Sequence, residues 1–289
     1  MDLSNRRTSN NVEDRRGKSA GKVTGGIGLG GIIIAAIIYF ATGDLNKAGQ
    51  ALQNTSSRTV GTEQTTPYQG TAEEEELAEF ASKVLAGTED VWTKIFRENG
   101  LTYKAPGLVL FTDAVQSGCG NATSQSGPFY CSADQKVYVD LSFFSTMKKQ
   151  FGTAGDFAYA YVIAHEVGHH VQYLLGTLIE AHQKMSRMSQ TEANKISVRL
   201  ELQADFYAGV WANYDNKMFK SLEEGDIDEG LAIAARIGDD YLQKKAYGKT
   251  MPETFNHGTS DQRSRWLKKG INTGDISKGN TFDIAYEKL

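Results

Sequence analysis

The chain has 289 residues, of which 40% are hydrophobic and 23% are charged. This composition supports one sizeable core and excludes both a largely disordered chain and a membrane protein with many spans. The formal net charge of -4 argues against a nucleic-acid-binding protein, because such proteins need a strongly basic surface. The charge is uneven: residues 1–41 hold six basic and three acidic residues, and the remainder holds 25 basic and 32 acidic residues.

The first distinctive segment is an apolar run at residues 23–41, which contains 19 residues and no charge. As a helix it is long enough to cross a hydrocarbon core about 30 Å thick. A buried core helix and a cleaved signal peptide are the alternatives, but the long charged segment before the run favours an uncleaved anchor. Because the basic residues precede the run, we expect a cytoplasmic tail at residues 1–22, a single transmembrane helix at 23–41, and the rest outside the cytoplasmic (inner) membrane.

Residues 42–72 are rich in Gly, Ser, Thr, Gln and Asn and predict a flexible linker, with an irregular arm packed on the domain as the alternative. Residues 73–289 are predicted to form one α+β domain that is mostly α. Two runs with β-branched or aromatic residues, at 108–112 and 136–141, predict short strands. Helical spacing predicts helices over residues 72–98, 157–175, 192–214, 227–246 and 260–269.

The only two cysteines of the chain, Cys119 and Cys131, lie in the portion expected to be exported. A disulfide between them is therefore allowed by the compartment. Two buried free thiols are the alternative. A zinc site built on this pair is disfavoured, because the spacing is not that of a zinc knuckle and no histidine is near.

The strongest chemical signal is the H-E-x-x-H motif at His165, Glu166 and His169. On a helix, positions i and i+4 face the same way, so both histidines can bind one metal ion while Glu166 shares that side. A catalytic zinc site usually has three protein ligands and leaves the fourth position to water. The pattern therefore predicts one Zn²⁺ and requires a third ligand from elsewhere in the chain.

Glu201 and Asp205 are the candidates for completing the site, since they also stand at i and i+4. Their helix is otherwise mostly apolar, and burying two carboxylates without partners would be costly. We expect Glu201 to bind the metal and Asp205 to accept the second N–H of a ligating histidine, which fixes its tautomer. A solvated acidic helix face is the alternative.

The chain resembles the neutral zinc metallopeptidases of bacteria, and more widely the gluzincin peptidases. The resemblance implies a zincin-like fold, peptidase activity, Glu201 as third ligand and Asp205 as its supporting partner. It rests on Asn11–Arg16 with the Gly-rich run that follows, Gly127–Cys131, His165–Gln172, Glu201–Asp205 and His257–Arg263.

Three further histidines are judged separately. His170 lies about 100° around the helix from His169 and is expected to be a neighbour of the site, not a ligand. His182 lies in a polar stretch and is expected to be solvated. His257 precedes a predicted helix in a segment that resembles a histidine motif of gluzincins, so we expect it to stabilise the oxyanion of the transition state, with Arg263 as a weaker alternative donor.

Together these features predict a membrane-anchored zinc endopeptidase that acts on a peptide or protein substrate. Glu166 is expected to act as general base on a zinc-bound water. The run at 136–141 is expected to be the edge strand that holds the extended peptide. Two alternatives stay open: a noncatalytic zinc-containing binding protein, and a metal hydrolase that acts on a nonpeptide cell-wall amide.

Overall fold

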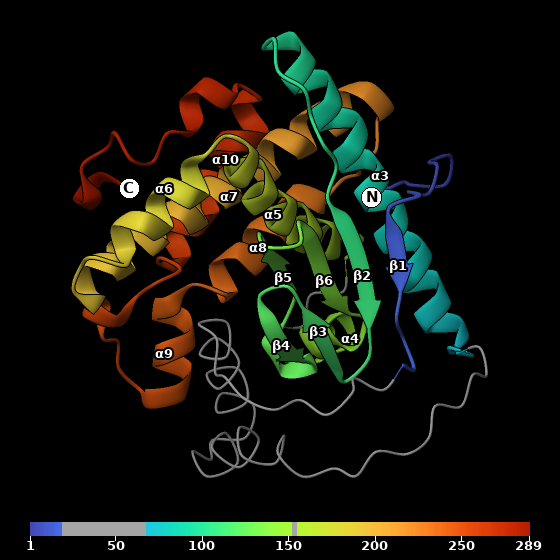
Figure 1. Ribbon diagram of the computed structural model, residues 1–289, viewed down its shortest axis with the longest axis horizontal. Coiled ribbons are helices and arrows are strands. Elements are labelled where there is room, and N and C mark those ends of the chain that lie inside the picture. Colours follow the sequence, from blue (N-terminus) through green and yellow to red (C-terminus); the bar gives the residue numbers. More distant parts are fainter. Residues whose placement is uncertain (19–67, 152–154) are drawn as a thin grey trace.

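The computed structural model describes residues 1–18, 68–151 and 155–289 (Figure 1). The described part is a mostly helical α+β fold, which confirms the predicted class. Its strands are β1 (Val12–Asp14), β2 (Gly107–Phe111), β3 (Ala114–Ser117), β4 (Gly120–Thr123), β5 (Phe129–Cys131) and β6 (Lys136–Asp140). Its α-helices are α3 (Ala72–Glu98), α4 (Ser142–Phe151), α5 (Asp156–Leu174), α6 (Thr177–Met185), α7 (Gln190–Phe219), α8 (Asp226–Arg236), α9 (Asp239–Tyr247) and α10 (Ser260–Thr273).

The main sheet has four strands in the order β1-β2-β6-β5. β1, β2 and β6 run parallel, and β5 pairs antiparallel with β6. β3 and β4 form a separate hairpin. The predicted strands at 108–112 and 136–141 are thus present as β2 and β6. The expectation that 136–141 forms the edge was wrong, because β6 is paired on both sides and β5 lies at that edge.

The helices form layers on one side of the sheet (Figure 1). α5 contacts β5 and β6 and packs on α7, while α10 packs along the other side of α7. Large buried rings fill the space between these layers, and they include Trp92, Phe157, Tyr161, Phe206 and Trp211. This burial explains why α5 and residues 198–212 of α7 are mostly apolar, a pattern typical of helix segments enclosed by other elements.

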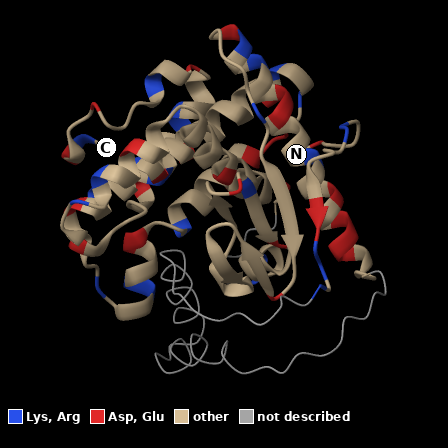
Figure 2. Cartoon of the chain, viewed as in Figure 1, with Lys and Arg blue, Asp and Glu red and all other residues tan. Residues whose placement is uncertain are grey.

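The long helix α3 begins at its predicted position, residue 72, for a local reason. Thr71 and Glu74 form a capping box, and Glu73 to Glu75 occupy the first turn, where negative charge favours a helix N-terminus (Figure 2). Glu75 also pairs with Arg16 at 3.0 Å between Oε1 and Nη2. The start of α3 is therefore joined to the N-terminal segment.

Residues 1–18 pack with residues 68–151 and 155–289, whereas the sequence suggested a tail at residues 1–22. Val12 pairs with Leu108 in the sheet, and Met1 and Leu3 are buried in the main core. The Arg6 guanidinium, of which 7% is exposed, bonds Asp215 at 2.8 Å.

The predicted anchor at 23–41 and most of the predicted linker at 42–72 lie outside the described residues. Within the described ranges, none of the helices combines the length and the apolar character that a membrane span requires.

The predicted helix at 227–246 is two helices, α8 and α9, that meet at Gly238. A Cβ at Gly238 would lie 2.3 Å from the backbone nitrogen of Ser260. The close approach of α10 therefore requires glycine at this position, and the chain turns there. Helical spacing alone did not show this break.

Candidate metal centre

The site is built where α5 crosses α7. A Cβ at Gly168 would lie 2.9 Å from the carbonyl oxygen of Ala204, so the two backbones approach as closely as glycine allows. This contact brings the H-E-x-x-H face of α5 against the carboxylates of α7. The pairing of the two motifs thus depends on Gly168, which carries no side chain.

His165, His169 and Glu201 converge, each with one ligand atom within 4.8 Å of the others. His165 Nε2 lies 3.2 Å from Glu201 Oε2, and His169 Nε2 lies 3.5 Å from Glu201 Oε1. Ligands bound about 2.0–2.2 Å from a tetrahedral zinc ion stand about 3.3–3.6 Å apart. The donor set of two imidazoles and one carboxylate, and its spacing, therefore fit Zn²⁺.

The outer nitrogens of both ligand histidines are held by hydrogen bonds. His165 Nδ1 donates to Asp205 Oδ1 at 2.8 Å, and His169 Nδ1 donates to Gln172 Oε1 at 2.9 Å. Gln172 is held in turn by its amide, which donates to the carbonyl of Leu200 at 2.7 Å. With Nδ1 protonated in both rings, each Nε2 presents a lone pair to the metal position.

Asp205 is fully buried and occupies the centre of a wider network. Arg263 donates to both of its oxygens at 2.9 Å, and the Tyr161 hydroxyl donates to it at 2.6 Å. Burial raises the pKa of this carboxyl, but Arg263 and His165 outweigh burial and lower it to about 2. Asp205 is thus a carboxylate, as its predicted role requires, and Arg263 is occupied in supporting it.

Glu166 is buried beside the ligand set. Burial raises its pKa to about 7, and the charge of Glu201 adds to the shift, whereas His165 and a backbone hydrogen bond from Tyr130 oppose it. A carboxylate whose pKa lies near neutrality can both take and return a proton. Glu166 interacts electrostatically with both His165 and Glu201, as its predicted place on the ligand side of α5 requires.

His257 lies within electrostatic reach of Glu201 and is held by Asp239. Its Nδ1 bonds Asp239 Oδ1 at 3.1 Å, and Asp239 Oδ2 accepts three backbone N–H groups, those of residues 256, 257 and 258. Burial lowers the pKa of His257, but Asp239 and Glu201 outweigh burial and raise it. His257 is therefore a positioned histidine that favours the protonated form.

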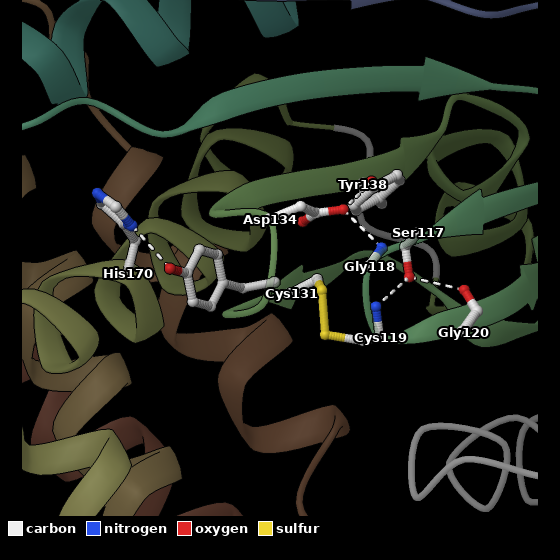
Figure 3. The surroundings of a disulfide bond; sticks show 9 residues. Ser117, Gly118, Cys119, Gly120, Cys131, Asp134, Tyr138 and His170 are labelled. Atoms are coloured by element: carbon white, nitrogen blue, oxygen red, sulfur yellow. Dashed lines mark hydrogen bonds between the residues drawn. A yellow bond between two sulfur atoms is a disulfide. The ribbon is translucent and has the colours of Figure 1, made fainter.

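The other two histidines do not belong to the ligand set. His170 is buried and bonds the carbonyl of Lys104 and the hydroxyl of Tyr130, and His182 is exposed on α6. The cysteines form the disulfide Cys119–Cys131, with Cα atoms 5.7 Å apart (Figure 3).

Sequence reasoning missed Gln172, Tyr161 and Asp239. Gln172 and Tyr161 stand three residues after His169 and four residues before His165 on the same helix, so helical spacing could have indicated both. Asp239 meets His257 only because α9 packs beside the segment that leads into α10. No spacing of residues in the sequence predicts the contact between Asp239 and His257.

Comparisons with known proteins agree with this geometry. The family model described as "Putative neutral zinc metallopeptidase" matches residues 1–282. The chain is 44% identical over 291 aligned residues to "Uncharacterized protein YpfJ" of Escherichia coli K12, covering 96% of this chain and 97% of that protein. It is 45% identical over 193 residues to "Uncharacterized protein Mb2605" of Mycobacterium bovis, covering 63% of this chain and 64% of that protein. No solved structure matches. The matched range includes the ligand set on α5 and α7, and the chain belongs to this neutral zinc metallopeptidase family.

Proposed function

We propose that this protein is a zinc-dependent endopeptidase. The observation that supports the proposal best is the convergence of His165, His169 and Glu201 beside the buried carboxyl of Glu166. A structural zinc site usually has four protein ligands, whereas three ligands leave a position for water. A general base beside such a position is the arrangement that amide hydrolysis requires.

The residues divide the chemistry between them. Bound at His165, His169 and Glu201, zinc would act as a Lewis acid and make the bound water acidic at neutral pH. Glu166 takes the proton of that water and returns it to the leaving amine. His257, held by Asp239, donates a hydrogen bond to the oxyanion. Asp205 and Gln172 keep the ligand histidines in the required tautomer.

The substrate is proposed to lie along β5. This strand is the edge of the main sheet, and it contacts α5, the helix that carries Glu166. An edge strand offers unpaired main-chain groups that bind an extended peptide without regard to its side chains. The proposed substrate is therefore a peptide or protein in extended form.

The disulfide supports export of the body. Disulfides persist in oxidising compartments and are rare in the cytosol. We therefore propose that the described body works outside the cytoplasmic membrane, with residues 23–41 providing attachment.

The test is a panel of peptides incubated with the full chain, before and after removal of metal and restoration of zinc. We expect zinc-dependent cleavage. Glu166→Gln is expected to retain about one zinc per chain and to lose activity by about 10²–10⁴-fold, because it removes a base and not a ligand. Glu180→Gln is the matched control, since Glu180 is exposed and pairs only with Lys184 among the described residues.

Three outcomes separate the alternatives. Zinc binding without cleavage of any substrate would favour the noncatalytic binding protein. Cleavage of cell-wall amides but not of peptides would favour the other hydrolase. Full activity of the Glu166→Gln variant would contradict the proposed mechanism.

A further inference from the structure

His170 is a buried histidine beside the metal ligands that the proposed mechanism does not use. None of its surface is exposed. Its Nε2 lies 2.7 Å from the carbonyl oxygen of Lys104, and a carbonyl only accepts hydrogen bonds, so Nε2 carries the proton. Nδ1 therefore accepts, and the hydroxyl of Tyr130 donates to it at 2.9 Å. The ring is held in one tautomer with both nitrogens satisfied.

Tyr130 is the middle residue of the edge strand β5. The next residue, Cys131, is tied by the disulfide to Cys119, and the loop before Cys119 is held by Asp134, which accepts the N–H of Gly118 at 2.7 Å (Figure 3). β5 has only three residues and pairs with β6 alone. Two consecutive residues of this short strand are thus anchored from outside the sheet, one by the disulfide and one by His170.

Tyr130 contacts α5 at two points. Its hydroxyl bonds His170 at 2.9 Å, and its ring centroid lies 6.4 Å from that of Tyr173. His170 and Tyr173 stand at i and i+3, so the two contacts lie on one face of the helix. The side chain of this edge-strand residue is therefore held against α5.

We propose that His170 is a positioning residue. By holding the Tyr130 hydroxyl, it fixes the edge strand β5 against α5 and thereby sets where an extended peptide lies relative to Glu166. The proposal rests on the proposed peptidase function. A displacement of the reacting groups by about 1 Å can lower the rate by up to about 100-fold. Loss of the anchor of a three-residue strand is therefore expected to have a measurable effect on catalysis.

A purely packing role is the competing explanation, because three tyrosine rings surround His170. Tyr103 packs edge-on at 5.9 Å between ring centroids, and Tyr130 at 5.3 Å. Tyr103 offers the control: its buried hydroxyl has no hydrogen-bond partner among the described residues. Tyr103→Phe and Tyr130→Phe make the same chemical change beside the same ring, but only Tyr130→Phe removes a hydrogen bond to it.

The first measurement needs no activity. Amide hydrogen exchange of residues 127–133 is followed in the full chain, and we expect Tyr130→Phe to speed exchange in β5 by about 10-fold or more while Tyr103→Phe leaves it unchanged. His170→Asn keeps an acceptor near the Nδ1 position, and His170→Gln keeps a donor near the Nε2 position. We expect His170→Gln to resemble Tyr130→Phe, and His170→Asn to exchange more slowly than His170→Gln.

The second measurement is kinetic. Tyr130→Phe and His170→Gln are each expected to raise KM about 10-fold for peptides long enough to lie along β5, with a smaller change in kcat and with zinc content unchanged. Short substrates that reach only the metal and Glu166 should be cleaved as by the wild type. The double variant should raise KM no more than either single variant does, because both substitutions remove the same hydrogen bond.

The outcomes separate this inference from the proposed function. If the wild type cleaves peptides and Tyr130→Phe changes neither exchange in β5 nor KM for long peptides, the positioning role is wrong. If Tyr103→Phe acts as strongly as Tyr130→Phe, packing explains the cluster and the proposal is overturned. If β5 loosens as expected but the wild type cleaves no peptide, the anchor stands and the peptidase function fails.

Discussion

The metal centre and the N-terminal segment are both built from buried charged groups, but they are held together over very different distances along the chain. The metal ligands come from two helices and stand at i and i+4 or face each other across one helix contact. Residues 1–18 instead make ion pairs with α3, α7, α8 and β6, and Arg6 bonds a residue 209 positions away. Buried charged groups thus form the candidate site in the metal centre, whereas in residues 1–18 they join parts of the chain that are distant in sequence.

The N-terminal segment is fastened by more than its strand. Asp215, of which 1% is exposed, accepts from Arg6 and from the hydroxyl of Ser221 at 2.5 Å. The Arg6 guanidinium also lies over the Phe219 ring, 3.6 Å from its centroid. Glu89 accepts hydrogen bonds from the side chains of Ser9 and Asn11. These groups lie far from the ligand set in sequence and serve to close the fold.

The largest effect should come from breaking a buried ion pair of residues 1–18. Arg6→Ala leaves Asp215 buried without its charged partner, which is expected to destabilise the protein by about 3–5 kcal/mol. Arg15→Ala is the control in the same segment, because the Arg15–Glu13 pair is partly exposed and such pairs contribute at most about 1 kcal/mol. Unfolding of the two variants in urea measures the difference. Equal stabilities would show that residues 1–18 do not hold the body together.

A comparable break in the metal centre should spare the fold. His257→Ala is expected to retain zinc and stability but to lower kcat by about 10²–10³-fold, because it removes the proposed oxyanion donor. His182→Ala, at an exposed position on α6, is the matched histidine control and should be active. Zinc analysis with steady-state kinetics on one peptide gives both readouts. Loss of zinc in His257→Ala would instead make His257 a ligand or a structural support.

The smallest expected effect concerns membrane topology. We expect no difference in labelling between the N-terminal and the C-terminal segments of the body. A single span at residues 23–41 would separate residues 1–22 from 42–289, whereas the structure pairs β1 with β2. Ser4→Cys and Ser277→Cys, both at exposed positions, should therefore label equally with an impermeant maleimide on cells with an intact cytoplasmic membrane. Export predicts that both label. Labelling of Ser277→Cys alone would mean that residues 1–18 leave the body when residues 23–41 span the membrane.

The same comparison explains how much of the fold and of the candidate site the sequence predicts. His165, Glu166, His169, Glu201 and Asp205 could be placed from helical spacing, because each motif lies within one helix and needs only one helix contact to meet the other. The positions of α3 and α5 followed from helical spacing. Local patterns of this kind survive in a sequence because their partners are three or four residues apart.

The misses share a different cause. β1, the edge position of β5 and the bond between His257 and Asp239 all depend on which distant segments meet, and no periodicity records that. Arg263 was considered as an oxyanion donor, yet its contacts with Asp205 come from α10 lying along α7. The break at Gly238 likewise reflects contact with another helix.

The position of β1 also sets an order of events during synthesis. Residues 1–18 leave the ribosome before their partners, because Val12 pairs with Leu108 and Arg6 with Asp215. At about 5–20 residues per second, the 209 positions between Arg6 and Asp215 take roughly 10–40 s to make. Residues 1–18 are therefore made long before they can fold into the body, and until they do, the β1-facing edge of β2 stays open to pairing with another chain.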